Sequence, residues 1–64
     1  MQCTIKFNME NAAFHDGGRK AAQGEVGVIL LDLTKKVMNE GCQSGTTYPI
    51  RDSNGNKIGQ AVFE

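Results

Sequence analysis

The chain lacks most of the features by which a short sequence reveals a function. It has no tryptophan, one proline, two cysteines and one histidine, and its seven basic residues are balanced by seven acidic ones. The balanced charge argues against a dedicated nucleic-acid-binding domain, because such domains carry a basic face that neutralises several phosphates. The absence of net negative charge equally disfavours an acidic mimic of nucleic acid.

Long apolar runs are also missing. No run approaches the roughly 18 residues that a membrane-spanning helix needs. The first residues lack the charged start, apolar stretch and cleavage site of a secretory signal, so we expect a cytoplasmic protein. Cys3 and Cys42 are too few for a zinc cluster, and a cytoplasmic location disfavours a disulfide. We expect both thiols to be buried or half-buried.

The 64 residues of the chain predict a single domain, residues 1–64. A domain of this size buries only roughly 60% of the surface that its unfolded chain exposes. Its stability is therefore expected to be marginal, which leaves room for a homodimer or for a protein partner.

The first part of the chain predicts a strand followed by a short turn. Residues 2–9 alternate between apolar and polar side chains, with the odd-numbered ones facing the core. Residues 10–14 break this alternation, and we expect a turn beneath the domain in which Phe14 is the apolar plug. Residues 15–18 then predict a loop.

A helix is the clearest element. It is predicted from about Glu25, whereas residues 19–24 are consistent with either a first helical turn or an extended lead-in, because Gly24 and Gly27 each cost roughly 0.5–1 kcal/mol in a helix. These glycines are expected to avoid a clash with the sheet or with the Phe14 turn; the alternative is a helix-mediated contact. Gly41 is expected to end the helix as a left-handed cap. The apolar stripe comprises Ala22, Val26, Ile29, Leu30, Leu33 and Val37.

The last third of the chain predicts a β-hairpin. Residues 47–51 form an edge strand, because Pro49 removes one ladder donor. Asn54 and Gly55 predict a two-residue turn of the mirror-image kind, with positive φ at both positions. Residues 57–63 form the last strand, with a bulge near Gly59.

These elements predict an α+β fold of order β-α-β-β, a three-stranded antiparallel sheet with one helix packed on one face. Thr4, Lys6, Tyr48 and Gln60 are expected on the opposite, uncovered face of the sheet. The core is expected where strand residues Cys3, Ile5, Phe7, Ile50, Ile58 and Phe63 meet helix residues Val26, Ile29, Leu30, Leu33 and Val37.

No motif predicts catalysis, a metal or a cofactor. The series Asp52, Asn54, Asn56 begins like a calcium loop, but Lys57 stands where that loop needs glycine, and its last acidic ligand is replaced by Phe63. A single histidine with no paired nucleophile argues against an enzyme. Arg19 and Lys20 follow a glycine pair and are the candidate contacts for an anion, although the spacing of a phosphate-binding loop is absent.

Three landmarks occur in order along the chain: Asn11-Ala12-Ala13-Phe14, then Glu25-Val26-x-x-Ile29-Leu30-x-Asp32-Leu33, and finally Arg51-Asp52-x-Asn54-Gly55-Asn56-Lys57-Ile58-Gly59. Together they resemble a group of small accessory proteins encoded by bacteriophages and prophages. The resemblance implies a phage-derived protein in the cytoplasm of a bacterial host, and it supplies no catalytic residue. The chain departs from the pattern at Gly27 and Leu31, and we expect Val28 and Leu31 to form a small exposed apolar patch on the helix.

The leading hypothesis is therefore a non-enzymatic module that binds a host or phage protein, such as a component of a bacterial defence system in the manner of an anti-CRISPR protein. An oligomeric protein that sequesters a small ligand, such as a nucleotide signal, between Arg19, Lys20, Arg51 and the Asn-rich turn is the alternative. A minor structural protein of a virion is third. The candidate protein contacts are Val28, Leu31, Arg51, Asp52, Asn54 and Asn56.

Overall fold

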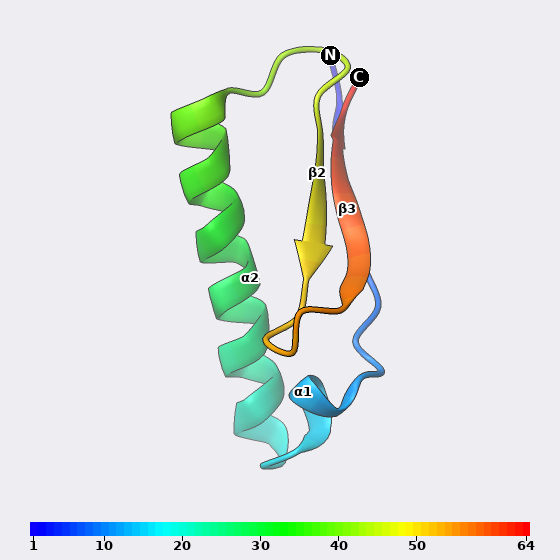
Figure 1. Ribbon diagram of the computed structural model, residues 1–64, viewed down its shortest axis with the longest axis vertical. Coiled ribbons are helices and arrows are strands. Elements are labelled where there is room, and N and C mark those ends of the chain that lie inside the picture. Colours follow the sequence, from blue (N-terminus) through cyan, green and yellow to red (C-terminus); the bar gives the residue numbers. More distant parts are fainter.

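The computed structural model describes the backbone of residues 1–64 and every side chain except that of Arg19. The predicted fold class is confirmed, because the strands form one antiparallel sheet in the order β1-β3-β2 and a long helix packs beside it. Figure 1 shows the long helix along the sheet, a short helix beneath the hairpin, and both termini at the opposite end. The elements are β1 (Cys3–Phe7), α1 (Ala12–His15), α2 (Arg19–Glu40), β2 (Thr47–Arg51) and β3 (Lys57–Phe63).

Strand β1 is shorter than the alternation of residues 2–9 predicts. Its ladder with β3 is nevertheless extended at both ends, because Gln2 and Glu64 exchange backbone hydrogen bonds and Asn8 N–H donates to the Ile58 carbonyl. The register sets odd-numbered residues of β1 opposite odd-numbered residues of β3. These odd-numbered side chains lie on the sheet face that α2 approaches.

The turn around Phe14 is confirmed, and it forms the short helix α1. Phe14 is 1% exposed, and its ring stacks on that of Phe7 with centroids 6.4 Å apart. Ile29 of α2 and Ile50 of β2 complete this cluster. The plug therefore joins both helices to the sheet at one end of the molecule.

Helix α2 begins at Arg19, so residues 19–24 are helical and not an extended lead-in. The prediction that Gly24 and Gly27 avoid a clash is wrong, because a Cβ atom at either position would meet no atom within 4 Å. Burial of Ile29 and Leu33 holds the helix despite the two glycines. The helix ends at Gly41, whose φ of 94° is positive as predicted but whose ψ of 177° is extended, so it is not a left-handed helical cap.

The hairpin turn differs from the predicted two-residue type. Gly55 has a φ of 86°, but Asn54 does not have a positive φ, so it does not take the mirror-image conformation. Gly55 N–H donates to the Asp52 carbonyl at 3.0 Å, and Asp52 N–H donates to the Asn56 carbonyl at 3.0 Å. The connection is therefore a wider loop in which Gly55 is the last residue of a four-residue turn.

The predicted bulge near Gly59 is confirmed. The register between β2 and β3 shifts between Ile50 and Arg51, which leaves Ile58 as the extra residue on β3. Gly59 itself lies against β1, since a Cβ atom there would come within 2.0 Å of the Lys6 carbonyl oxygen. Only glycine allows β1 and β3 to approach this closely.

The core differs from the prediction in the strand residues that it contains. Tyr48 is 8% exposed and faces the core, not the uncovered face, because it has the same parity as Ile50 on β2. Conversely, Cys3 is exposed, and Ile5 and Leu30 are 44% and 43% exposed. The buried residues of the second cluster are Leu33, Tyr48, Ala61 and Phe63. Helix α2 thus covers β2 and β3 more fully than it covers β1.

Tyr48 also fixes the end of α2. Its hydroxyl donates to the Gly41 carbonyl, and its ring meets that of Phe63 edge to face, with centroids 6.2 Å apart. Burial raises the pKa of the Tyr48 hydroxyl, and the nearby Glu40 and Cys42 raise it further. Tyr48 therefore stays neutral and remains a hydrogen-bond donor.

Within the described part of the chain, no helix has the length and apolar character that crossing a membrane would require.

Candidate functional site

The three sequence landmarks meet at the hairpin loop. From the first landmark, Asn11 donates its side-chain N–H to Asp52 Oδ2 at 2.8 Å. From the second, Glu25 Oε2 accepts the backbone N–H of Ser53 at 2.7 Å. Residues far apart in the sequence therefore hold the third landmark against α1 and α2. These hydrogen bonds give all three landmarks a structural explanation.

Asp52 is the centre of this arrangement. Its Oδ1 accepts the backbone N–H groups of Asn54 and Asn56 at 3.0 and 2.9 Å. The hydrogen bond from Asn11 holds the pKa of the Asp52 carboxyl below its ordinary value; burial opposes this effect, and the hydrogen bonds from Asn56 and Asn54 add to it. The carboxylate is thus charged, and its hydrogen bonds are accepted from donors within the chain.

The predicted contact residues of this loop separate into two kinds. Asp52 is 5% exposed, so its carboxylate is not presented to a partner and it supports the loop instead. Arg51, Asn54 and Asn56 are exposed. Arg51 Nη1 donates to the Gly55 carbonyl at 3.3 Å, which lays this side chain along the loop.

Of the predicted anion contacts that the structure describes, Lys20 and Arg51 do not line the same hollow. Lys20 is exposed near the start of α2, and the Arg19 side chain lies outside the described residues. The hollow beside Arg51 has a volume of about 200 Å³ and is lined by Asp32 and Lys36, not by Lys20. A carboxylate beside Arg51 is unfavourable for an anionic ligand.

The outer face of α2 is apolar and exposed. Val28 and Leu31 are each 56% exposed, as the sequence predicts. At about 100° per residue, Gly24 and Gly27 lie on the same side of the helix as these two side chains. We call Gly24, Gly27, Val28 and Leu31 the outer face of α2.

A second apolar surface, which the sequence does not predict, lies between α2 and β1. This groove has a volume of about 350 Å³, and Ile5 from the strand and Leu30 and Met38 from the helix are exposed along it. Its signal in the sequence is the consecutive run Ile29-Leu30-Leu31, which is too wide for one buried stripe. The β1–α2 groove is lined by Cys3, Ile5, Leu30, Leu33, Thr34, Val37, Met38 and Phe63.

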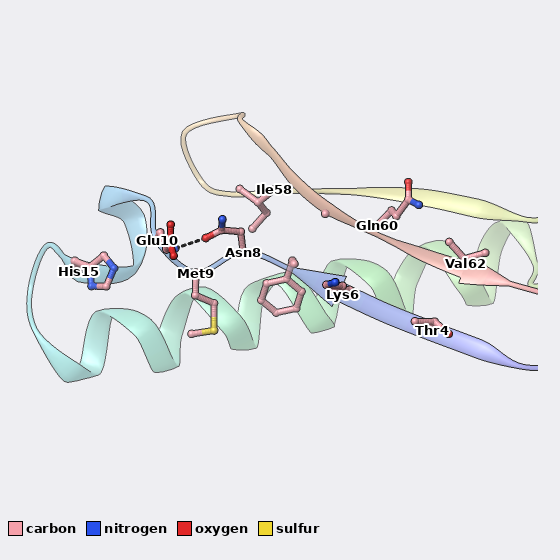
Figure 2. A pocket seen from close by; sticks show the side chains of 11 residues that line it. Thr4, Lys6, Asn8, Met9, Glu10, His15, Ile58, Gln60 and Val62 are labelled. Atoms are coloured by element: carbon pink, nitrogen blue, oxygen red, sulfur yellow. Dashed lines mark hydrogen bonds between the residues drawn. The ribbon is translucent and has the colours of Figure 1, made fainter.

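A further hollow, of about 810 Å³, opens on the other side of β1. Thr4, Lys6 and Gln60 lie along it, which confirms their predicted place on the uncovered face. Figure 2 shows Glu10 and His15 at one end of the hollow and Thr4 at the other, so the polar side chains do not converge on one point. The residues along it are Thr4, Lys6, Phe7, Asn8, Met9, Glu10, His15, Ile58, Gly59, Gln60 and Val62.

In the part of the chain that the structure describes, no three His, Cys, Asp or Glu side chains lie together as a metal site would require. The hydrogen bond of Asn8 Oδ1 in the large hollow is to the backbone N–H of Glu10, at 2.7 Å, and it shapes the chain locally (Figure 2).

Comparison with known proteins gives no family for this chain: no family model, no curated protein and no solved structure matches it.

Proposed function

We propose that this protein acts by binding another protein through the outer face of α2. The observation that carries the proposal is the exposure of Val28 and Leu31 on a helix whose opposite side is already buried against the sheet. Exposed apolar side chains that gather on one face mark interaction surfaces more often than scattered ones do.

The glycines of this face support a helical partner element. Among the described residues, no atom outside the backbone of α2 itself lies within 4 Å of a Cβ atom placed at Gly24 or Gly27, so this side of the helix is open there. A second helix can approach an axis closely where side chains are absent, and apolar anchors three and four residues apart are the usual contacts of a helix surface. The glycines are therefore not needed for packing within the chain, and they allow a second helix to pack closely on this face.

Charge defines the chemistry of that partner further. Lys20 and Lys35 are exposed, and at helical spacing they lie on the same side of α2 as Gly24 and Leu31, one toward each end. The fitting partner is an amphipathic helix with an apolar centre and acidic residues at its ends. The resemblance to phage accessory proteins directs the search toward proteins of a phage or of its bacterial host, including defence components.

The test compares two variants that add the same charge to different surfaces. Leu31→Glu changes the outer face of α2, and Gln60→Glu changes an exposed polar position of β3 on the sheet face away from α2. Immobilised chains are incubated with extract from infected and uninfected bacteria, and circular dichroism verifies that both variants fold. We expect a protein that the unmodified chain and Gln60→Glu retain, and that Leu31→Glu binds at least about tenfold more weakly.

Equal retention of every bound protein by the two variants would contradict the proposal. Binding that is unaffected by raised salt would also contradict the proposal, because the attraction of the lysines for acidic residues should be screened by salt.

A further inference from the structure

The open edge of β1 carries backbone groups that the chain leaves unpaired. Gln2 and Glu64 exchange two hydrogen bonds, of 2.7 and 2.8 Å, which sets the alternation of the ladder between β1 and β3. Even-numbered residues of β1 therefore bond to β3, as Asn8 does at the end of the ladder. The N–H and C=O groups of the odd-numbered residues point away from the sheet. These residues are Cys3, Ile5 and Phe7.

The other edge of the sheet is protected. Phe63 N–H donates to the Thr46 carbonyl at 2.9 Å, so the odd-numbered residues of β2 present their backbone groups to the open side. Pro49 stands at the centre of that edge and has no N–H group. Strand β1 contains no proline, and the register irregularity of the sheet lies between β2 and β3. Of the two edges, only that of β1 can accept a full strand.

Strand β1 is also incompletely covered on its inner face. Ile5 lies at its centre and is 44% exposed, beside Leu30 and Met38 on α2. No charged side chain lines the β1–α2 groove in the described part of the protein. An unprotected edge beside an uncharged apolar groove is a surface on which strand pairing also covers apolar area.

We propose that the β1 edge pairs with the β1 edge of a second copy of this chain, antiparallel, with Ile5 opposite Ile5 across a two-fold axis. In this register Cys3 faces Phe7 of the second copy, so every outward N–H and C=O group of both strands gains a partner. The Ile5 side chains meet at the axis, and the two β1–α2 grooves lie next to each other on the same face of the joined sheet.

Charge selects this register among its neighbours. With Ile5 opposite Ile5, the Lys6 side chain faces Thr4 of the second copy. A shift of the pairing by two residues in one direction would set Lys6 directly opposite Lys6, which is destabilising. The opposite shift would carry Phe7 beyond the end of the other strand. The chain has no net charge, so the two copies do not repel each other at long range.

The assembly ends at two copies. Once the β1 edges are joined, both outer edges of the larger sheet are β2 strands, which Pro49 protects. The outer face of α2 points away from the sheet and stays available in both copies. The dimer therefore does not depend on the function proposed above, and either can fail without the other.

Directed disulfide formation tests the register. Thr4 and Lys6 of the second copy form a non-hydrogen-bonded pair, with Cα atoms about 4.5 Å apart, within the range that a disulfide spans. Thr4→Cys and Lys6→Cys are made as separate chains, each carrying Cys3→Ser and Cys42→Ser, and are oxidised mildly alone and as an equal mixture. We expect the mixture to give at least about tenfold more cross-linked dimer than either chain alone.

The matched control applies the same design to the protected edge. Thr47→Cys and Arg51→Cys lie two residues to either side of Pro49 and would face each other if two β2 edges paired about Pro49, and their mixture is expected to give no excess of cross-linked product. Equal cross-linking by the two mixtures, or by Thr4→Cys alone, would overturn the proposal.

The unmodified chain provides a second measurement that needs no cysteine variant. Sedimentation equilibrium is expected to give twice the chain mass of 6.9 kDa at high concentration. Ile5→Lys, which sets two cations at the axis, is expected to weaken association at least about tenfold while circular dichroism stays unchanged. A mass of one chain at every concentration would overturn the proposal. This holds even if β1 pairs with a strand of a different protein, because the proposal names a second copy of this chain.

Discussion

The two edges of the sheet differ in how well they are protected against pairing with a further strand. Strand β2 carries Pro49 at its centre, and the loop that follows it is tied to α1 through Asn11 and to α2 through Glu25. Strand β1 has neither protection, and its central residue Ile5 is exposed on the inner face. Unpaired backbone groups and exposed apolar area therefore lie on the same side of this molecule. An interaction at the β1 edge would bring the largest gain in free energy of association.

The largest effect is expected from a substitution that separates β1, the open edge, from β3. Gly59→Ala places a Cβ atom 2.0 Å from the Lys6 carbonyl oxygen and 2.5 Å from Phe7 Cα. Because backbone atoms cannot rotate away as a side chain does, we expect the free energy of unfolding to fall by more than about 3 kcal/mol in urea denaturation.

The matched control is Gly24→Ala. Its new Cβ atom meets open space inside a helix, so the free energy of unfolding should rise by about 0.5–1 kcal/mol. Similar losses of stability in the two alanine variants would contradict the close approach of β1 and β3 at Gly59.

The next largest effect is expected where the loop after β2 is tied down. Asn11→Ala removes the hydrogen bond that Asn11 donates at 2.8 Å, and the free energy of unfolding should fall by about 1–2 kcal/mol. Urea denaturation measures the change. A variant as stable as the unmodified chain would show that the loop holds itself without α1.

Acid should loosen the same end of the molecule. The pKa of the Asp52 carboxyl is lowered in the folded protein, chiefly by the hydrogen bond from Asn11, so the group binds its proton less readily folded than unfolded. Its stabilisation is therefore complete above the ordinary pKa of about 3.9 and is lost as the pH falls through the lower folded value. Thermal unfolding across this acidic range should show a smaller pH dependence for Asn11→Ala; an unchanged pH dependence would contradict the role of Asn11.

The smallest change in stability is expected from opening the protected edge. Pro49→Thr restores an N–H group on the outward side of β2, and the free energy of unfolding should stay within about 1 kcal/mol of that of the unmodified chain. We expect the two edges to become alike, so that light scattering detects assemblies larger than a dimer. A variant with the mass of the unmodified chain would show that Pro49 is not what closes this edge.

The sequence predicts the elements of this fold well, because their periodicities are local. The alternation of β1, the stripe of α2 and the edge position of Pro49 each depend on neighbouring residues. Phe14 stands out as the one large apolar residue between Met9 and Val26. The exposure of Val28 and Leu31 follows in the same way from their place on the helix.

The features that the sequence does not predict depend on contacts between distant residues. The hairpin loop takes its wider form because the Asp52 carboxylate collects donors from its own loop and from Asn11, and no property of Asn54 and Gly55 reports this. The β1–α2 groove exists because Phe14, Ile29 and Ile50 draw α2 toward β2, and the position of a helix across a sheet is a property of the packed core.

Amide hydrogen exchange compares the two edges of the sheet in one experiment. At concentrations where the chain is associated, the account predicts that the outward amides of β1, those of Cys3, Ile5 and Phe7, are protected although the chain itself gives them no partner. Dilution should remove this protection and leave that of Thr4 and Lys6, which bond to β3. Thr47 and Arg51 on the outward side of β2 should exchange rapidly throughout. Exchange of the Ile5 amide as fast as that of Arg51 at every concentration would contradict the central claim that β1 is the open, pairing edge of this protein.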